Sequence, residues 1–209
     1  MSDVAEAARG SHRRRGVLAV LSVLGLLVLV GWLAVSWITP HPYSGTVLQA
    51  PEAAPSMDGL VLDDGTEVDL TAFEGQLLLV YFGYMSCPDV CPTTLSMAAS
   101  ARRALGDDAD RVRLLMISVD PERDSLDALG DYVRSFDESF VAATGDLDTL
   151  DRVAAQYGIF FGRGEELGDE YAVDHTATLM GIDSEGHLRI VWPAALELDR
   201  LVADLRELL

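Results

Sequence analysis

The sequence predicts an α/β domain with a central mixed sheet flanked by helices, preceded by a single N-terminal transmembrane helix. Three observations support this. A run of 22 residues without a charged side chain occupies 17–38. From residue 76 onward, continuous apolar runs typical of strands buried on both faces alternate with amphipathic segments. Near the C-terminus two strand-like runs follow each other directly, as in a hairpin, and an amphipathic segment closes the chain.

The N-terminal segment predicts an uncleaved membrane anchor. A helix of 22 residues is roughly 33 Å long, enough to cross a hydrocarbon core of about 30 Å. A signal peptide is shorter and ends in small residues, unlike Trp37-Ile38-Thr39-Pro40, but a cleaved signal or a twin-arginine signal at Arg13-Arg14 stays an alternative. Because basic residues stay in the cytoplasm, we expect residues 1–16 there and the C-terminal domain on the periplasmic, extracytoplasmic side of the cell (inner) membrane.

Composition limits what the exported part can do. Residues 39–58 contain four prolines and predict an irregular tether, which leads into a domain at 59–209. Four of the 15 basic and two of the 34 acidic residues precede residue 39, so the remainder carries 11 arginines and 32 carboxylates, a net charge of −21. This charge argues against nucleic-acid binding, which needs a basic face. It fits a solvated acidic surface or the attraction of cations and basic partners.

The elements of the domain match a thioredoxin-like fold, in which strands joined by right-handed crossovers are followed by a hairpin and a helix. Pro92 suits the first turn of a helix, and Gly158 and Gly186 suit a helix end and a hairpin turn. The predicted elements are an added hairpin at 59–68, a strand at 76–83, a helix at 91–105, a strand at 112–119, a helix at 125–136, a short strand at 140–143, a helix at 146–157, a hairpin of strands 176–182 and 188–192, and a helix at 196–208.

The sequence contains two cysteines, Cys87 and Cys91, where the first buried strand gives way to a helix. Open α/β folds bind ligands at this end of the strands, and a helix N-terminus favours the thiolate over the thiol. The pair closes too short a loop to stabilise a domain, so it predicts redox chemistry, metal binding or both. Redox thioredoxins use Cys-x-x-Cys, whereas three intervening residues leave room for a metal, and a disulfide can still close.

A two-sulfur metal site needs a third ligand, and the sequence offers four histidines. His12 is predicted to be cytoplasmic, His41 lies in the tether, and His187 falls in a hairpin turn. His175 precedes the strand at 176–182, which approaches the cysteine-bearing helix in a thioredoxin-like layout. A histidine before a strand is more often structural, but two thiolates and an imidazole form a soft set that suits copper, above all Cu(I), and can accept Cu(II). We therefore predict His175 as the third ligand.

Four stretches of the sequence match a known family. They are Gly83-Tyr84-Met85-Ser86-Cys87-Pro88-Asp89-Val90-Cys91-Pro92, Ser118-Val119-Asp120-Pro121-Glu122-Arg123-Asp124, Tyr157-Gly158-Ile159-Phe160-Phe161 and Val173-Asp174-His175-Thr176. Through them the sequence resembles the Sco/SenC family of cytochrome oxidase assembly proteins over roughly 45–209. The resemblance implies that Cys87, Cys91 and His175 are copper ligands. It also implies a role in delivering copper to, or keeping reduced, the cysteines of the binuclear copper site in cytochrome c oxidase subunit II.

Other functions remain open. The fold and a redox-active Cys87–Cys91 pair also allow an extracytoplasmic thiol–disulfide oxidoreductase, a role that can coexist with copper delivery. The extra residue in the motif and the lack of proline at 174–177 argue against it, because thioredoxin-like reductases place a cis-proline there. A peroxiredoxin-type enzyme would need a Pro-x-x-x-Thr-x-x-Cys pattern, which the site lacks. Nothing in the sequence excludes a redox or copper sensor, so enzymatic activity is undecided.

Three carboxylates near the site have expected roles. Asp174 either orients His175 or is a solvated loop residue. Asp120 follows the second strand and either orients a neighbour or caps the next helix. Asp89 is expected to stabilise the first helical turn through the helix dipole.

Overall fold

The computed structural model describes residues 21–32, 43–48, 52–167 and 170–209. The chain divides into two units, Met1–Pro42 and Tyr43–Leu209. In the first unit, residues 21–32 form a helix with exposed side chains. The predicted anchor at 17–38 lies only partly within the described residues, and the predicted cytoplasmic segment 1–16 lies outside them. None of the helices among the described residues is long and apolar enough to cross a membrane.

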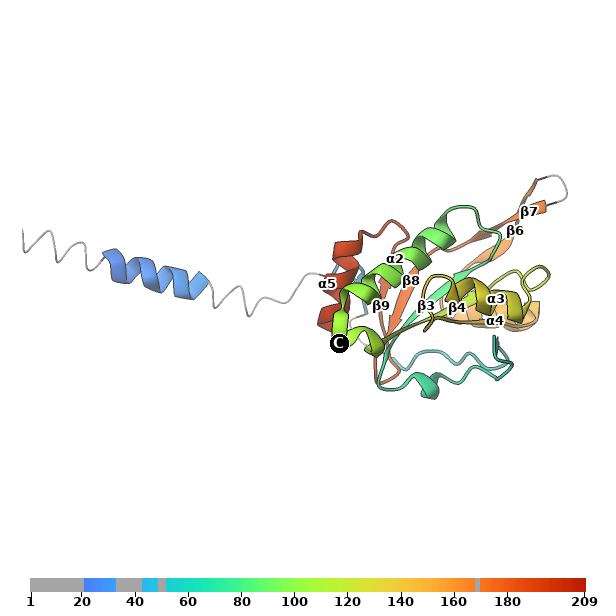
Figure 1. The fold of residues 1–209 in the computed structure, drawn as a ribbon, viewed down its shortest axis with the longest axis horizontal. Helices are drawn as coiled ribbons and strands as arrows, with labels where there is room; N and C mark the ends of the chain where they lie inside the picture. Colours follow the sequence, from blue (N-terminus) through green and yellow to red (C-terminus); the bar gives the residue numbers. More distant parts are fainter. Residues whose placement is uncertain (1–20, 33–42, 49–51, 168–169) are drawn as a thin grey trace, which may run out of the picture. The chain divides into compact units, whose positions relative to one another are not determined.

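The second unit is built on a seven-stranded sheet with strand order β1-β9-β8-β3-β4-β5-β2 (Figure 1). Strands β3, β4 and β5 are parallel, while β1, β2, β8 and β9 pair antiparallel with their neighbours. Every residue of β3 is buried, as its continuous apolar run predicts. The strands are β1 (Thr46–Val47), β2 (Val61–Leu62), β3 (Leu77–Gly83), β4 (Val112–Ser118), β5 (Val141–Thr144), β8 (Leu179–Ile182) and β9 (Leu188–Trp192).

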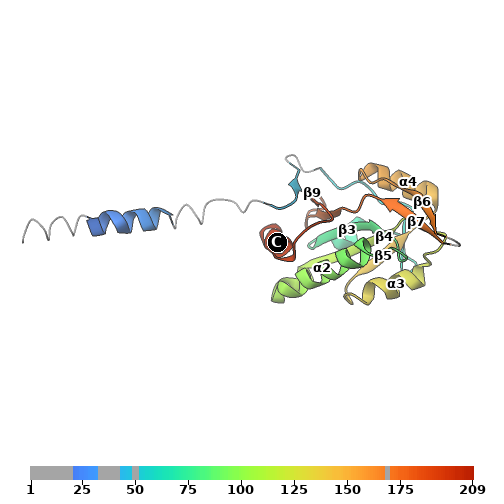
Figure 2. The ribbon, with the colours of Figure 1, turned by 90° about the horizontal axis from the view of Figure 1, so that it is seen from above.

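Helices cover both faces of this sheet. Helices α2 and α3 lie on one face and α4 lies on the other (Figure 2), and α5 packs beside α2. Ser125 and Asp146 cap α3 and α4 by accepting hydrogen bonds from the amides of Ala128 and Thr149, which fixes where these helices begin. The helices are α2 (Val90–Ala104), α3 (Leu126–Arg134), α4 (Leu147–Gln156) and α5 (Leu198–Leu208), with short 3-10 segments η1 (Leu70–Phe73) and η2 (Gly106–Arg111). All four predicted helices are confirmed.

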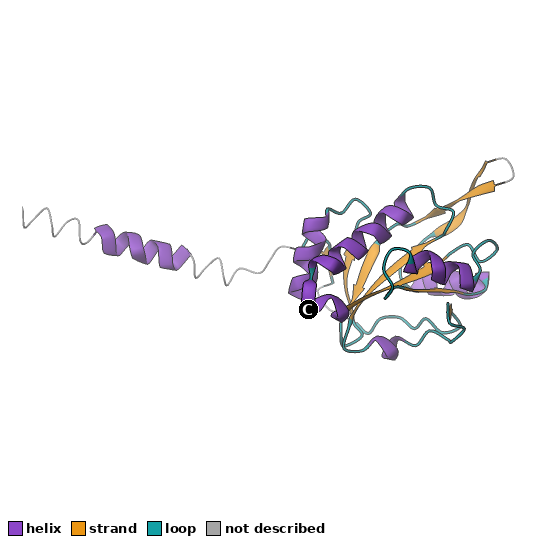
Figure 3. Ribbon diagram, in the orientation of Figure 1, coloured by secondary structure: helices purple, strands orange, loops and turns teal. Residues whose placement is uncertain are grey.

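A second hairpin, β6 (Phe161–Leu167) and β7 (Glu170–His175), was not predicted. It forms its own two-stranded sheet and projects beyond the main one (Figure 3). Its sequence contains Gly162 and Gly164 and is rich in charge, so it lacks the apolar alternation that identifies a buried strand. The predicted strand at 176–182 begins only at Leu179 because residues 176–178 connect β7 to β8.

The described part of the predicted tether at 39–58 packs on the domain. Strand β1 pairs with β9, Ala53 forms a bridge with His187, and Met57 is buried in the core. A side chain at Gly45 would lie 2.7 Å from the Trp192 ring, so only glycine allows this close approach. The edge of β9 offers unpaired backbone groups that attract such a segment. The compact unit therefore begins at Tyr43.

Candidate metal centre

Cys87 and Cys91 lie at the carboxyl end of β3, as predicted. The chain leaves β3 at Gly83, turns through residues 84–89 and enters α2 at Val90. Cys91 is the second residue of α2 and has no exposed surface, whereas Cys87 in the turn is 7% exposed. Both are free thiols. The two sulfurs thus come from one short turn, with Cys87 nearer to solvent.

His175 ends strand β7 and reaches this turn from a segment 84 residues away. Its Nε2 atom lies 3.6 Å from the sulfur of Cys91, and its Nδ1 atom lies 3.3 Å from the carbonyl oxygen of Val173. The hydrogen bond to the carbonyl assigns the proton to Nδ1, which leaves the Nε2 lone pair facing the sulfur. The Tyr84 and Tyr81 rings lie nearly perpendicular to the imidazole, with ring centroids 5.6 and 6.3 Å away. The structure therefore brings His175 and Cys91 together.

Two residues that were not predicted shape the space around the Cys91 sulfur. The Tyr81 hydroxyl donates a hydrogen bond to this sulfur at 3.4 Å. At Gly83 a Cβ atom would lie 2.9 Å from the sulfur and 2.7 Å from the Tyr81 ring. Alternation along β3 places residues 81 and 83 on the same face, a signal that could have identified them.

Burial determines the protonation of the two groups in contact. It raises the pKa of the Cys91 thiol to about 12 and lowers the pKa of His175. The expectation that the helix N-terminus favours a thiolate is therefore wrong for Cys91, because loss of hydration outweighs the helix dipole. At neutral pH the metal-free site holds a protonated thiol and a neutral imidazole. A bound cation must displace the thiol proton, and it then supplies the charge that stabilises the thiolate.

The donor set fits a soft metal ion. Two sulfurs and an imidazole nitrogen without a proton are ligands that copper prefers. Burial is the main cause of the raised pKa of the Cys91 thiol, and the neighbouring Cys87 adds to it. Cys87, Cys91 and His175 are the residues that could hold such an ion.

The structure shows the contacts of the three carboxylates near the site. The carbonyl oxygen of Val173 holds the His175 ring in place of Asp174, whose carboxylate lies against Gly164, where an added Cβ would be 3.1 Å away. Asp89 precedes α2 and accepts a 3.4 Å hydrogen bond from Thr93 instead of capping the helix backbone. Asp120 is buried and orients a neighbour, as one of its two predicted roles required.

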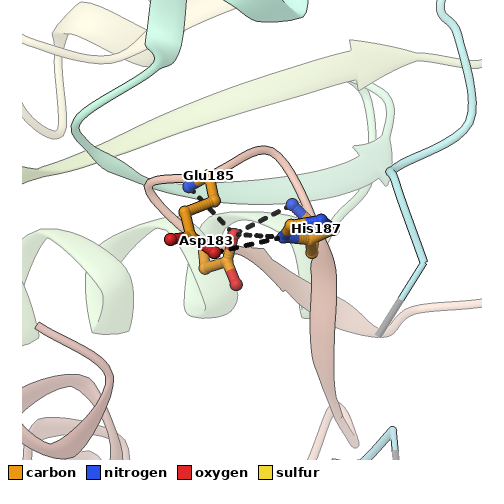
Figure 4. A group of neighbouring side chains, drawn as sticks. All are labelled: Asp183, Glu185 and His187. Atoms are coloured by element: carbon orange, nitrogen blue, oxygen red, sulfur yellow. Dashed lines mark hydrogen bonds and ion pairs between the residues drawn. The ribbon is translucent and has the colours of Figure 1, made fainter. Parts of the chain in front are cut away.

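A tighter cluster of possible ligands lies in the β8–β9 turn. Of the side chains that the structure describes, Asp183, Glu185 and His187 alone form a group of three whose ligand atoms all lie within 4.8 Å of one another (Figure 4). Asp183 Oδ1 accepts hydrogen bonds from the amides of Glu185 and His187 at 3.0 and 2.9 Å, and Asp183 Oδ2 lies 3.4 Å from Arg189. These contacts close the turn, so the cluster has a structural explanation. Cys87, Cys91 and His175 are less tightly grouped than this cluster.

Comparison with known proteins identifies a family and several relatives that match this chain. The family model described as SCO1/SenC matches residues 57–209. A SCO2-like protein of Rickettsia conorii is 30% identical over 177 residues, which cover 81% of this chain and 86% of that protein. The human mitochondrial SCO1 homologue is 38% identical over 119 residues, 54% of this chain and 38% of that protein.

The solved structures agree with the sequence comparison. The structure of Bradyrhizobium japonicum ScoI with copper bound is 32% identical and covers 77% of this chain and 98% of its own, with a TM-score of 0.65. The residues matched by the family model, 57–209, include the cysteine turn and His175. Both the sequence and the fold therefore show that this chain belongs to the SCO1/SenC family.

Proposed function

We propose that the chain is a copper chaperone that holds copper with Cys87, Cys91 and His175 and delivers it to the binuclear copper site of cytochrome c oxidase subunit II. The approach of His175 Nε2 to within 3.6 Å of the Cys91 sulfur carries this proposal. The copper-bound Bradyrhizobium relative supports copper as the metal. The resemblance to oxidase assembly proteins supports subunit II as the acceptor of the copper.

The exposure of the ligands suggests an order of transfer. Copper with two or three ligands exchanges readily because an incoming cysteine can bind before a resident ligand leaves. His175 is half-buried and Cys87 is 7% exposed, whereas Cys91 has no exposed surface. An acceptor cysteine therefore displaces His175 or Cys87 first, and Cys91 releases the metal last.

The N-terminal run supports a membrane location for this chemistry. Residues 17–38 would anchor the chain as a single span in the cell membrane, with the copper-binding domain on its outer, periplasmic side. The uncharged length of the run and the helix at 21–32, with its exposed apolar side chains, support this arrangement. The acceptor subunit would be reached on the same side.

A transfer assay tests the proposal. The full-length chain, purified in a mild detergent and loaded with Cu(I), is mixed with the metal-free soluble domain of subunit II after its cysteines have been reduced and the reductant removed. We expect copper to move to the acceptor, and His175→Ala to hold and transfer less. His187→Ala is the matched control, because His187 is a half-buried histidine like His175 but belongs to the β8–β9 turn and not to the proposed copper site. Equal behaviour of the two variants contradicts the proposal.

A second candidate function is thiol–disulfide exchange on the same acceptor. The free thiols of one short turn, with Cys87 the more exposed, favour this activity. The same assay run without copper, on an acceptor with oxidised cysteines, measures it. Loss of thiols from the chain with an equal gain in the acceptor, unchanged in His175→Ala, would favour the reductase.

A further inference from the structure

We infer that the β4–α3 loop, residues 119–125, is a bridging loop that positions both halves of the metal centre. In this inference Asp120 positions His175 through Tyr171, and Asp124 positions the cysteine turn. Asp120, Tyr171 and Asp124 are not metal ligands themselves. The inference rests on the proposed function in that Cys87, Cys91 and His175 are taken to hold copper.

The histidine half depends on Tyr171, which lies four residues before His175 in strand β7. Its hydroxyl donates a 2.7 Å hydrogen bond to Asp120 Oδ1, and Asp120 is only 3% exposed. Arg123 donates to Asp120 Oδ2 at 2.5 Å and to the carbonyl oxygen of Tyr171 at 3.0 Å. The Arg123 guanidinium also stacks on the Tyr171 ring, 3.7 Å from its centroid. The bridging loop thus holds both the side chain and the backbone of Tyr171.

These contacts matter because the β6–β7 hairpin pairs with itself and not with the main sheet. Strand register fixes the cysteine turn after β3, but it does not fix β7 relative to that turn. Residues 176–178 join the end of β7 to β8, and side-chain contacts along β7 supplement this backbone link in setting the position of His175. Tyr84 adds a further contact, with its ring centroid 5.6 Å from that of His175 and 5.8 Å from the Arg123 guanidinium.

The cysteine half depends on Asp124 at the other end of the bridging loop. Asp124 Oδ2 accepts hydrogen bonds from the backbone amide of Met85 at 3.0 Å and from the Ser118 hydroxyl at 2.6 Å. Met85 lies two residues before Cys87. The amide of Val119 donates to the carbonyl oxygen of Gly83 at 2.9 Å, which joins the loop to the start of the same turn. One short segment therefore contacts both parts of the chain that carry the ligands.

The two halves predict different losses. Without the hydrogen bond between Tyr171 and Asp120, the hairpin would sample positions in which the imidazole lies farther from the sulfurs. Cu(II), which needs the imidazole, would then be bound about tenfold more weakly, the low end of the loss seen for outer partners of metal ligands. Cu(I), which the two thiolates can still hold without the imidazole, would lose affinity to a smaller extent than Cu(II).

The experiment compares Tyr171→Phe with Tyr157→Phe in the full-length chain. The control also removes one phenol hydrogen bond, from Tyr157 to the carbonyl oxygen of Pro55 at 2.6 Å. Chelator competition measures affinity for Cu(II) and Cu(I), and electron paramagnetic resonance measures the nitrogen coupling of bound Cu(II). We expect weaker Cu(II) binding and reduced nitrogen coupling only in Tyr171→Phe. Equal behaviour of the two variants, or equal losses for Cu(II) and Cu(I), would overturn the inference for His175.

Two further variants complete the test. Asp124→Asn weakens a charge-assisted hydrogen bond to Met85, so it should lower Cu(I) affinity severalfold, whereas Asp89→Asn, at an exposed carboxylate of the same turn, should not. Identical Cu(I) affinities would overturn the cysteine half. His175→Ala should abolish the nitrogen coupling. If that coupling persists in His175→Ala, the proposed function itself fails, independently of the result at Tyr171.

Discussion

Gly83→Ala should damage the metal centre without altering any ligand. The added methyl group would lie 2.7 Å from the Tyr81 ring and 2.9 Å from the Cys91 sulfur, closer than side-chain carbon atoms approach in folded proteins. Tyr81, Cys91 and Gly83 are all buried, so the strain can be relieved only by moving the ring or the sulfur. Overpacking of this kind costs about 1–3 kcal/mol. For a domain of this size that corresponds to a fall in Tm of roughly 2–12 °C.

The assay follows thermal unfolding of the metal-free chain and, separately, its Cu(I) affinity. Gly162→Ala is the matched control, because its methyl group would make only an ordinary 3.5 Å contact with the Phe160 ring. We expect both stability and copper affinity to fall in Gly83→Ala and to stay near wild type in the control. If the two glycine variants have the same Tm and affinity, the close packing around the Cys91 sulfur is not as described.

Three more predictions concern the Cys91 sulfur and one buried hydrogen bond of the core. Tyr81→Phe removes the 3.4 Å hydrogen bond to the Cys91 sulfur. Because such a bond contributes about 1 kcal/mol, its loss should weaken copper binding about fivefold. A chelator competition that finds no loss of affinity would contradict this. Because the pKa of Cys91 is raised to about 12, copper must displace its proton at neutral pH, so affinity should rise with pH by about tenfold per unit for each proton released. Titration calorimetry in buffers of different ionisation enthalpy counts that proton, and zero release would refute the argument. In the wild type the Trp192 indole donates a 2.8 Å hydrogen bond to Asp204. Asp204→Ala leaves this buried indole without its acceptor and should lower the free energy of unfolding by about 3 kcal/mol. An unchanged Tm would disprove this prediction.

Much of the fold could be predicted because its elements have strong local signals. The apolar run of β3 and the amphipathic pattern of α4 match the period of the structures they form. The β6–β7 hairpin could not be predicted in this way, since it is stabilised by pairing with itself and by contacts such as the stacking of the Arg123 guanidinium on the Tyr171 ring. The edge strand β1 was missed because two residues carry no period, and its position depends on the free edge of β9.

The candidate ligands could be named from the sequence, but their environment could not. Cys87, Cys91 and His175 stand out by residue type and spacing. The protonation of Cys91 depends on burial, which a helix-start argument does not measure, and the structure reverses that expectation. The role of Asp120 was one of two alternatives until its bond to Tyr171, 51 residues away in the chain, was known.

The most direct test of the copper site is X-ray absorption at the copper edge on the loaded full-length chain and on His175→Ala. We expect two sulfur ligands and one nitrogen ligand in the wild type, and loss of the nitrogen with both sulfurs kept in the variant. An identical ligand set in the two proteins, or a wild-type site without sulfur, would contradict the assignment of Cys87, Cys91 and His175 as the copper ligands.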